Sequence, residues 1–306
     1  MKILYAGTPA VAVPPLVHLA ERPDAEIVGV LTRTDAPVGR RRVLTPSPVA
    51  QEAERRGLPV LKANRVDAAL TGRLRELGAD VAAVVAYGAL VPQEALEALP
   101  HGWVNLHFSL LPRWRGAAPV QRALMAGEAV AGASTFLLET GLDTGPVIAT
   151  TTDPVRPEDT AGTVLDRLSR TAAPLLADSL RAVVDGTARP EPQRGEVTLA
   201  PKLTGEDARV RWEEPAAAVA ARVRGVSPEP GAWTLLDGRR LKLGRVESRP
   251  DEHGLAPGEC ALRDGSVLVG TGAGAVRLTE VQPAGKKAMD AAAWMRGTGT
   301  AGVVLG

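Results

Sequence analysis

Residues 104–119 read VNLHFSLLPRWRGAAP, and this stretch organises our interpretation of the whole chain. Its first half alternates as a strand does, with apolar side chains on one face and Asn105 and His107 together on the other. Pro112 and Gly116 then turn the chain into a loop. Because ligands of α/β proteins bind outside the carboxyl ends of such strands, the stretch predicts part of a functional site.

A second loop, GLDTG at residues 141–145, places Asp143 between glycines and between two predicted strands. An isolated Asn-x-His pair in a strand is more often a structural hydrogen-bonded pair than a site. The added carboxylate favours catalysis, because an amide can donate to an oxyanion, an imidazole can transfer a proton, and an acid can orient the imidazole. We therefore predict a catalytic group formed by Asn105, His107 and Asp143.

The spacing of strand-like runs predicts the fold of the first part of the chain. Helical patterns separate most of these runs, which indicates an α/β, Rossmann-like, mostly parallel doubly wound sheet. The run at 81–86 is apolar throughout, as expected for a central strand. Only Gly7 follows the first strand where a dinucleotide site needs G-x-G-x-x-G, which excludes NAD and FAD. The predicted strands are residues 2–6, 27–32, 60–61, 81–86, 104–108, 134–138 and 147–151.

A change in texture divides the chain into a catalytic domain at 1–187, a Pro- and Gly-rich linker at 188–203, and a second domain at 204–306. The second domain shows short strands punctuated by Asp-Gly turns, which predicts a small β-barrel of OB type. It holds 14 Lys and Arg against 13 Asp and Glu, so any RNA contact there must be a patch. The Gly-rich final fifteen residues suggest fraying.

Composition limits the remaining classes of function. The chain has 306 residues, 45% hydrophobic and 23% charged, with a net charge of +1, which argues against coating nucleic acid through bulk charge. Cys260 is the only cysteine, so no disulfide within the chain and no bound metal are expected. The N-terminus resembles a strand and not a signal peptide, and the longest nearly apolar run, 81–91, is too short to span a bilayer. We expect a cytoplasmic monomer.

A basic segment follows the second predicted strand. Residues 33–48 form a long polar connection that contains GRRR at 39–42 and leads into LTPSPV at 44–49. A charge run of this kind is usually a solvated loop. Consecutive guanidinium groups can also clamp phosphates of a nucleic acid, and the sequence leaves both interpretations open.

Three motifs together carry a resemblance to a known family. The run SLLPRWRGAAPVQRAL at 109–124 follows Asn-x-His and precedes GLDTG, and PAGKKAM occupies 283–289. This combination resembles the folate-dependent formyltransferases and, within that family, the members that act on methionyl-tRNA. The resemblance extends from the first strand to PAGKKAM and is weakest in the linker.

The resemblance implies transfer of a formyl group from N10-formyltetrahydrofolate to the amino group of methionyl initiator tRNA. In that reaction the amine attacks directly, Asn105 stabilises the oxyanion, and His107 and Asp143 handle protons and charge. It implies folate binding by the loop at 109–112, and by backbone groups near 87–88. The implied folate-binding residues are Ser109, Leu110, Leu111, Pro112, Tyr87 and Gly88.

It also implies that basic residues contact the tRNA, although a solvated lysine turn remains an equal interpretation of the second pair. The implied tRNA-binding residues are Arg40, Arg41 and Arg42, then Lys286 and Lys287. Arg113, Trp114 and Arg115 could face the RNA or hold the loop. Three other functions stay open: formylation of a purine precursor or nucleotide sugar, RNA binding on an inactive scaffold, and folate hydrolysis that releases formate.

Overall fold

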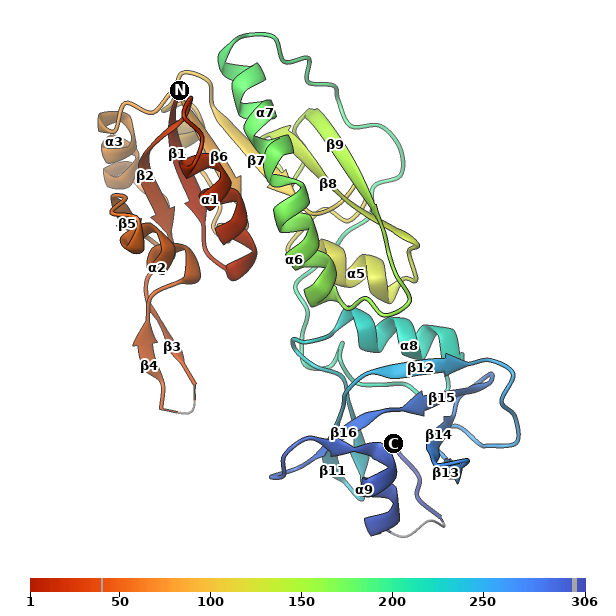
Figure 1. Ribbon diagram of the computed structural model, residues 1–306. Helices are drawn as coiled ribbons and strands as arrows, with labels where there is room; N and C mark the ends of the chain where they lie inside the picture. Colours follow the sequence, from red (N-terminus) through yellow and green to blue (C-terminus); the bar gives the residue numbers. More distant parts are fainter. Residues whose placement is uncertain (40, 299–301) are drawn as a thin grey trace. The chain divides into compact units, whose positions relative to one another are not determined.

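The computed structural model describes residues 1–39, 41–298 and 302–306, and the chain forms two compact units (Figure 1). Unit 1 comprises Met1–Pro119, Val130–Pro154 and Leu165–Ala200. Unit 2 comprises Val120–Ala129, Val155–Val164 and Pro201–Gly306. The domain limits 1–187, 188–203 and 204–306 stay a prediction. The compact units divide the chain differently, since the expected linker up to Ala200 lies within unit 1.

A seven-stranded sheet forms the centre of unit 1, in the order β5-β2-β1-β6-β7-β8-β9. The pairings from β5 to β7 are parallel, and β8 and β9 are added antiparallel. All of β6 is buried, as its apolar sequence predicts, and the mostly parallel Rossmann-like fold is confirmed. The strands are β1 (Lys2–Gly7), β2 (Glu26–Thr32), β5 (Val60–Lys62), β6 (Val81–Val85), β7 (Trp103–His107), β8 (Val130–Leu137) and β9 (Val147–Pro154).

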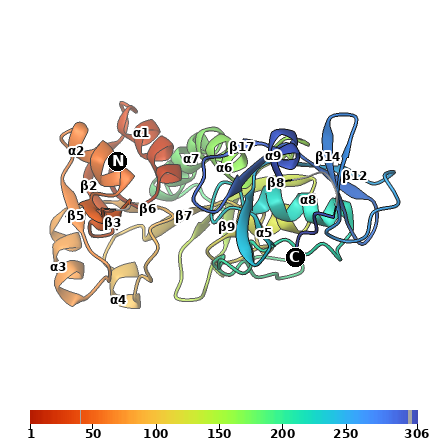
Figure 2. The same ribbon diagram turned by 90° about the horizontal axis from the view of Figure 1, so that it is seen from below.

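Helices cover both faces of this sheet, with α3 and α4 on one face and α1, α2 and α7 on the other (Figure 2). Leu4 and Ala6 of β1 pack with the first group, whereas the Tyr5 hydroxyl donates to the Ala12 carbonyl beside α1. The helical stretch expected at 158–184 breaks before Pro174 into α6 and α7, as predicted. The helices are η1 (Ala10–Ala12), α1 (Val13–Ala20), α2 (Pro48–Arg55), α3 (Ala68–Glu76), α4 (Gln93–Leu96), α5 (Pro119–Met125), α6 (Ala161–Thr171) and α7 (Ala173–Val184).

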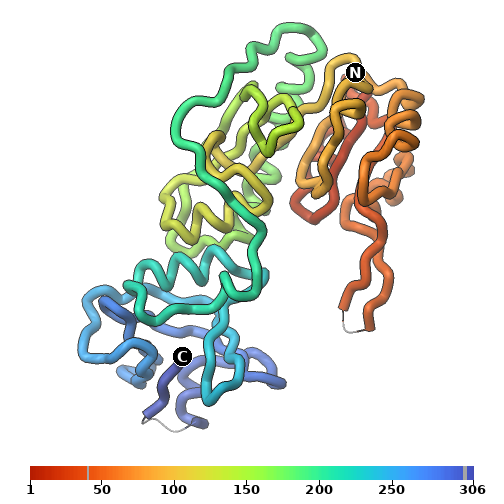
Figure 3. Tube along the Cα trace, turned by 180° about the vertical axis from the view of Figure 1, so that it is seen from behind, coloured from red at the N-terminus to blue at the C-terminus, as the bar shows by residue number. Residues whose placement is uncertain are grey.

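The basic segment after β2 is a β-hairpin, which corrects the expectation of a polar loop. Strands β3 (Ala36–Val38) and β4 (Val43–Thr45) pair antiparallel and extend away from the sheet of unit 1 (Figures 1 and 3). Three apolar side chains are exposed on it: Val38 at 56%, Val43 at 59% and Leu44 at 69%. Backbone pairing alone therefore shapes this hairpin, because no apolar face is buried.

Unit 2 contains two four-stranded antiparallel sheets, β10-β11-β16-β17 and β12-β15-β14-β13. β11 runs almost directly into β12, and β15 into β16, so the two sheets continue into one barrel-like layer, which confirms the expected β-barrel-like domain. Both Asp-Gly turns, at 237–238 and 264–265, have positive φ at each residue, the predicted type I′ geometry. The strands are β10 (Trp233–Leu236), β11 (Arg239–Leu243), β12 (Val246–Arg249), β13 (Cys260–Arg263), β14 (Ser266–Gly270), β15 (Ala275–Leu278), β16 (Glu280–Pro283) and β17 (Met289–Asp290).

The end of the described chain packs into unit 2, so the expectation of fraying was wrong for the residues that the structure describes. Helix α9 (Ala291–Thr298) buries Trp294 and Met295 against the core, which α8 (Ala216–Gly225) also lines. Leu305 is 2% exposed, and Gly306 exchanges two backbone hydrogen bonds with Leu235, of 2.7 and 3.0 Å. Strand pairing outweighs the local flexibility that the glycine content suggests.

Candidate active site

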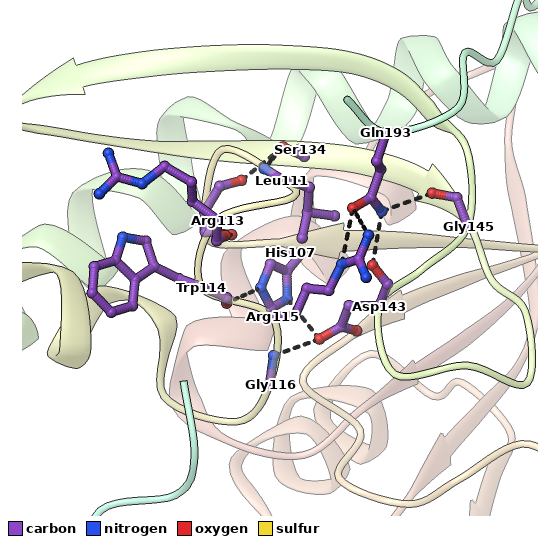
Figure 4. A network of polar contacts seen from close by, with 11 residues as sticks. His107, Leu111, Arg113, Trp114, Arg115, Gly116, Ser134, Asp143, Gly145 and Gln193 are labelled. Carbon is purple, nitrogen blue, oxygen red and sulfur yellow. Dashed lines mark hydrogen bonds and ion pairs between the residues drawn. The ribbon is translucent and has the colours of Figure 1, made fainter. Parts of the chain in front are cut away.

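His107 ends β7 with its imidazole nearly buried, 8% exposed, and acceptors at both ring nitrogens (Figure 4). Nε2 lies 3.0 Å from the carbonyl oxygen of Trp114, and Nδ1 lies 3.8 Å from Oδ2 of Asp143. A carbonyl only accepts, so Nε2 carries a proton and donates it. Nδ1 is therefore the nitrogen that faces the carboxylate and remains available to exchange a proton.

Asp143 reaches His107 by a route that the sequence did not suggest. Strand β8 is antiparallel to β7, and Leu137 at its end lies opposite Val104, at the far end of β7 from His107. The loop after β8 must therefore fold back along the strand pair. Gly145 permits this fold, because an added Cβ would collide with the Leu137 carbonyl oxygen.

A backbone N–H fixes the carboxylate of Asp143. Gly116 donates from its backbone nitrogen to Oδ2 at 2.7 Å. Gly116 adopts φ +124, and an added Cβ would lie 2.7 Å from the Ala200 carbonyl oxygen, so only glycine fits. The glycine of the quoted stretch thus positions a donor, beyond ending the strand.

Asn105 precedes His107 by two residues on β7, so its side chain lies on the same face of the sheet. It is half-buried, and its amide makes no hydrogen bond to the residues that the structure describes. Phe136 lies opposite it on β8 and meets the His107 ring edge-on, with centroids 6.4 Å apart. Phe108 is 6% exposed on the other face, as its register predicts.

The loop after β7 is held by its own backbone and by Ser134 of β8. The Ser109 hydroxyl donates to the Arg113 carbonyl at 2.6 Å. Ser134 Oγ donates to the Ser109 carbonyl at 2.7 Å and accepts from the Leu111 backbone nitrogen at 3.2 Å. The predicted folate-binding loop is therefore pre-formed in this structure.

Two further members of the predicted folate set are anchored in the same loop. Leu110 packs so closely over Gly132 of β8 that a Cβ there would lie 2.6 Å from Leu110 Cδ2. Pro112 is buried and follows a cis peptide bond. These side chains fix the path of the loop between His107 and Trp114.

Tyr87 and Gly88 follow β6, next to the end of β1, where the strand order reverses. The Tyr87 ring is 2% exposed, its hydroxyl donates to the Ala63 carbonyl at 2.9 Å, and burial raises the pKa of the phenol. Its backbone carbonyl accepts from the Thr8 hydroxyl at 2.8 Å. Gly88 is exposed and adopts φ +82, so this turn offers backbone and not side-chain groups to a ligand.

Residues that sequence reasoning missed come from the expected linker. Gln193 contacts the backbone of the Asp143 loop and the side chain of Arg115 (Figure 4). Thr198 accepts from the Trp114 backbone nitrogen at 2.9 Å. The segment shows no strand or helix periodicity, so no local signal predicted these contacts. Arg115 is thereby shown to hold the loop, one of its two open interpretations.

Comparison with known proteins agrees with this geometry. The sequence profile "Formyl transferase" matches residues 1–180, and the profile "Formyl transferase, C-terminal domain" matches residues 202–299. The chain belongs to the formyl transferase family. It is therefore an enzyme that transfers one-carbon formyl groups.

Members of this family resemble the chain over nearly its whole length. A relative named methionyl-tRNA formyltransferase, from Arthrobacter sp. strain FB24, is 58% identical over 297 residues, 97% of each chain. A solved methionyl-tRNA formyltransferase from Clostridium thermocellum has a TM-score of 0.59 at 15% identity, covering 91% of this chain and 98% of that one. HypX from Aquifex aeolicus, solved with tetrahydrofolic acid, has a TM-score of 0.63 at 21% identity, covering 96% and 46%. The two solved structures show the fold alone.

The basic residues lie apart from this formyl transferase site in the chain and on the surface. Arg41 and Arg42 are exposed in the β3–β4 turn, where Arg42 adopts φ 50, and Arg40 lies outside the described residues. Lys286 and Lys287 are exposed between β16 and β17 in unit 2. These side chains are available to a solution partner within each unit.

Two searches of the described residues found no further features of this kind. In the part of the chain that the structure describes, no group of three or more His, Cys, Asp and Glu side chains is placed to hold a metal ion. Within residues 1–39, 41–298 and 302–306, no helix is both long and apolar enough to cross a membrane.

Proposed function

We propose that this formyl transferase uses N10-formyltetrahydrofolate to formylate the α-amino group of methionyl initiator tRNA, which supplies formylmethionyl-tRNA for translation initiation. The observation that carries the proposal is the His107–Asp143 pair, 3.8 Å apart, beside the unengaged amide of Asn105. The 58% identity to a protein named methionyl-tRNA formyltransferase supports the choice of acceptor. The same fold in a protein solved with tetrahydrofolic acid supports the choice of donor.

The reaction is acyl transfer without an enzyme nucleophile. The amine nitrogen forms a bond to the formyl carbon, and the carbonyl oxygen becomes an oxyanion that the Asn105 amide stabilises by donating a hydrogen bond. The bond from the formyl carbon to N10 then breaks. One proton leaves the amine and one reaches N10, so the overall charge is unchanged.

His107 is the group that moves this proton, because imidazole exchanges protons near neutral pH. Its Nε2–H is occupied by the Trp114 carbonyl, so Nδ1 accepts the proton and returns it. The carboxylate of Asp143 faces Nδ1 and stabilises the ring while it is charged. Gly116 holds that carboxylate in place.

Substrates approach from the edge where β6 and β7 end. We place the folate against the backbone at Tyr87 and Gly88, and against the loop formed by residues 109–112. We place the tRNA on Arg40, Arg41 and Arg42 of the hairpin segment, and on Lys286 and Lys287. A chain with a net charge of +1 must concentrate its RNA contacts in such local patches. We retain a monomeric, cytoplasmic enzyme as part of the proposal.

A formyl-transfer assay with radiolabelled N10-formyltetrahydrofolate tests this function. The acceptors are methionine-charged initiator tRNA, free methionine and an amino-sugar nucleotide, and released formate is measured in parallel. We expect label on the charged tRNA alone. Label on the sugar, or formate release without transfer, would overturn the acceptor assignment and leave the roles of Asn105, His107 and Asp143 open to a related reaction.

A further inference from the structure

Asp143 is held in a conformation that its own loop does not explain. It adopts φ 51, the left-handed region, which costs energy for a residue with a side chain and persists only where the surroundings enforce it. Its carboxylate must nevertheless face Nδ1 of His107. Some contact outside the loop therefore has to fix the backbone of Asp143.

That contact is the side-chain amide of Gln193 (Figure 4). Its Nε2 donates to the Asp143 carbonyl at 2.7 Å and to the Gly145 carbonyl at 2.8 Å. Its Oε1 accepts from Arg115 Nε at 3.0 Å and from Nη2 at 2.6 Å. Both donors and both acceptor positions of the amide are thus used. The reversed amide would set an acceptor against two carbonyls and a donor against a guanidinium, so this network defines the orientation.

Gln193 therefore connects the two loops that supply the site. Asp143 and Gly145 belong to the loop after β8, whereas Arg115 belongs to the loop after β7. The neighbours of Arg115 complete the site, since Trp114 accepts from His107 and Gly116 donates to Asp143. Shifting the amide would move the carboxylate and the imidazole partner together.

Gln193 itself is fixed from both sides by the segment that carries it, residues 191–200, which we name the strap. At one end Glu191 exchanges two backbone hydrogen bonds with Val147 of β9, each of 2.8 Å. At the other end Ala200 accepts from the Ala118 backbone nitrogen at 3.1 Å and donates to the Arg115 carbonyl at 2.7 Å. The strap is a rigid platform for one side chain.

We propose that Gln193 is a positioning residue for formyl transfer, which sets the distance between Asp143 and His107 by holding the backbone of Asp143. This inference rests on the function proposed above. Gln193 lies behind Asp143 and transfers no proton itself, so its effect must pass through the carboxylate. A misplacement of about 1 Å at a reacting group can cost roughly 10²-fold in rate.

Gln193→Glu tests the proposal with almost no change of volume. The carboxylate still accepts from Arg115, which supports folding, but it presents lone pairs to the Asp143 and Gly145 carbonyls and repels them. We expect kcat for charged tRNA to fall by about 10- to 100-fold, with both KM values within about 3-fold of wild type. Gln51→Glu is the matched control, because the Gln51 amide also donates to a backbone carbonyl, that of Pro46 at 2.8 Å. This control should keep the wild-type kcat.

A double-mutant cycle with Asp143→Asn separates positioning from general structure. If Gln193 acts through Asp143, adding Gln193→Glu to Asp143→Asn should lower kcat by less than about 2-fold more. Full additivity would overturn the proposal, as would a wild-type kcat in a folded Gln193→Glu enzyme. If that variant does not fold, Gln193→Ala takes its place in the same cycle under the same criteria. Absence of transfer by the wild-type enzyme would instead refute the proposed function.

Discussion

Asp143→Asn tests the electrostatic role that we give to the carboxylate. The variant keeps the shape of the side chain and an oxygen that can accept from Gly116, so the loop should stay folded. At the observed 3.8 Å, a full charge pair between Asp143 and His107 is worth about 4 kcal/mol for an effective dielectric constant of about 20. Since each 1.4 kcal/mol is about tenfold in rate, that energy corresponds to a ceiling near 10³-fold.

We expect Asp143→Asn to lower kcat by about 10²- to 10³-fold, because the charged imidazole forms in the transition state and not in the ground state. Single-turnover formylation of charged tRNA measures this directly, without a contribution from product release. The KM for each substrate should change little. A folded variant whose single-turnover rate lies within about 3-fold of wild type would refute the electrostatic argument.

Asp153→Asn is the control for this prediction. Asp153 forms an equally buried ion pair in unit 1, with Arg167 Nε 2.6 Å away and side chains 19% and 16% exposed. Removing its charge should lower the melting temperature and leave kcat unchanged. The comparison separates loss of a buried carboxylate from loss of one beside His107.

Three further predictions concern other parts of the chain. Asn105→Ala should lower kcat by about 10²- to 10³-fold in the transfer assay, the usual cost of one oxyanion donor. Replacing Arg41 and Arg42 by Ala should raise the KM for charged tRNA and flatten its salt dependence by about 1 log unit per log unit of salt for each phosphate that is no longer neutralised; an effect on folate KM alone would contradict this. Arg122 lowers the pKa of Asp207 to about 2, so this stabilisation is full above pH 4 and lost toward pH 2. Asp207→Asn should therefore lower the melting temperature at pH 7, by roughly 1–2 kcal/mol in stability, but not at pH 2.

Local pattern predicted those parts of the structure that local forces determine. The apolar run of β6 gave a central strand, and the two Asp-Gly turns gave type I′ hairpins because few other residues tolerate two positive φ angles. Alternation in β7 put Asn105 and His107 on one face. The proximity of Asp143 to His107 was expected from the two loops together.

The remaining features depend on contacts between distant residues. The direction of β8 is set by pairing with β7, and nothing within its sequence distinguishes a parallel from an antiparallel strand. Gln193 binds partners 50 and 48 residues away, through a side chain in a segment without periodicity. The exposed apolar residues of the β3–β4 hairpin also hide its pairing, since neither strand buries a face. Sequence pattern carries little information on such contacts.

The interleaving of the two compact units limits how this chain can be recombined with its relatives. Residues 120–129 and 155–164 lie between segments of unit 1 yet pack in unit 2. There Arg122 pairs with Asp207 at 2.8 Å, and Gly225 packs so closely on Met125 that a side chain would collide. A chimera that joins residues 204–306 of one relative to 1–203 of another would mismatch these contacts. Exchange should succeed only when 120–129 and 155–164 travel with the C-terminal part, so the enzyme evolves as one woven chain and not as two interchangeable modules.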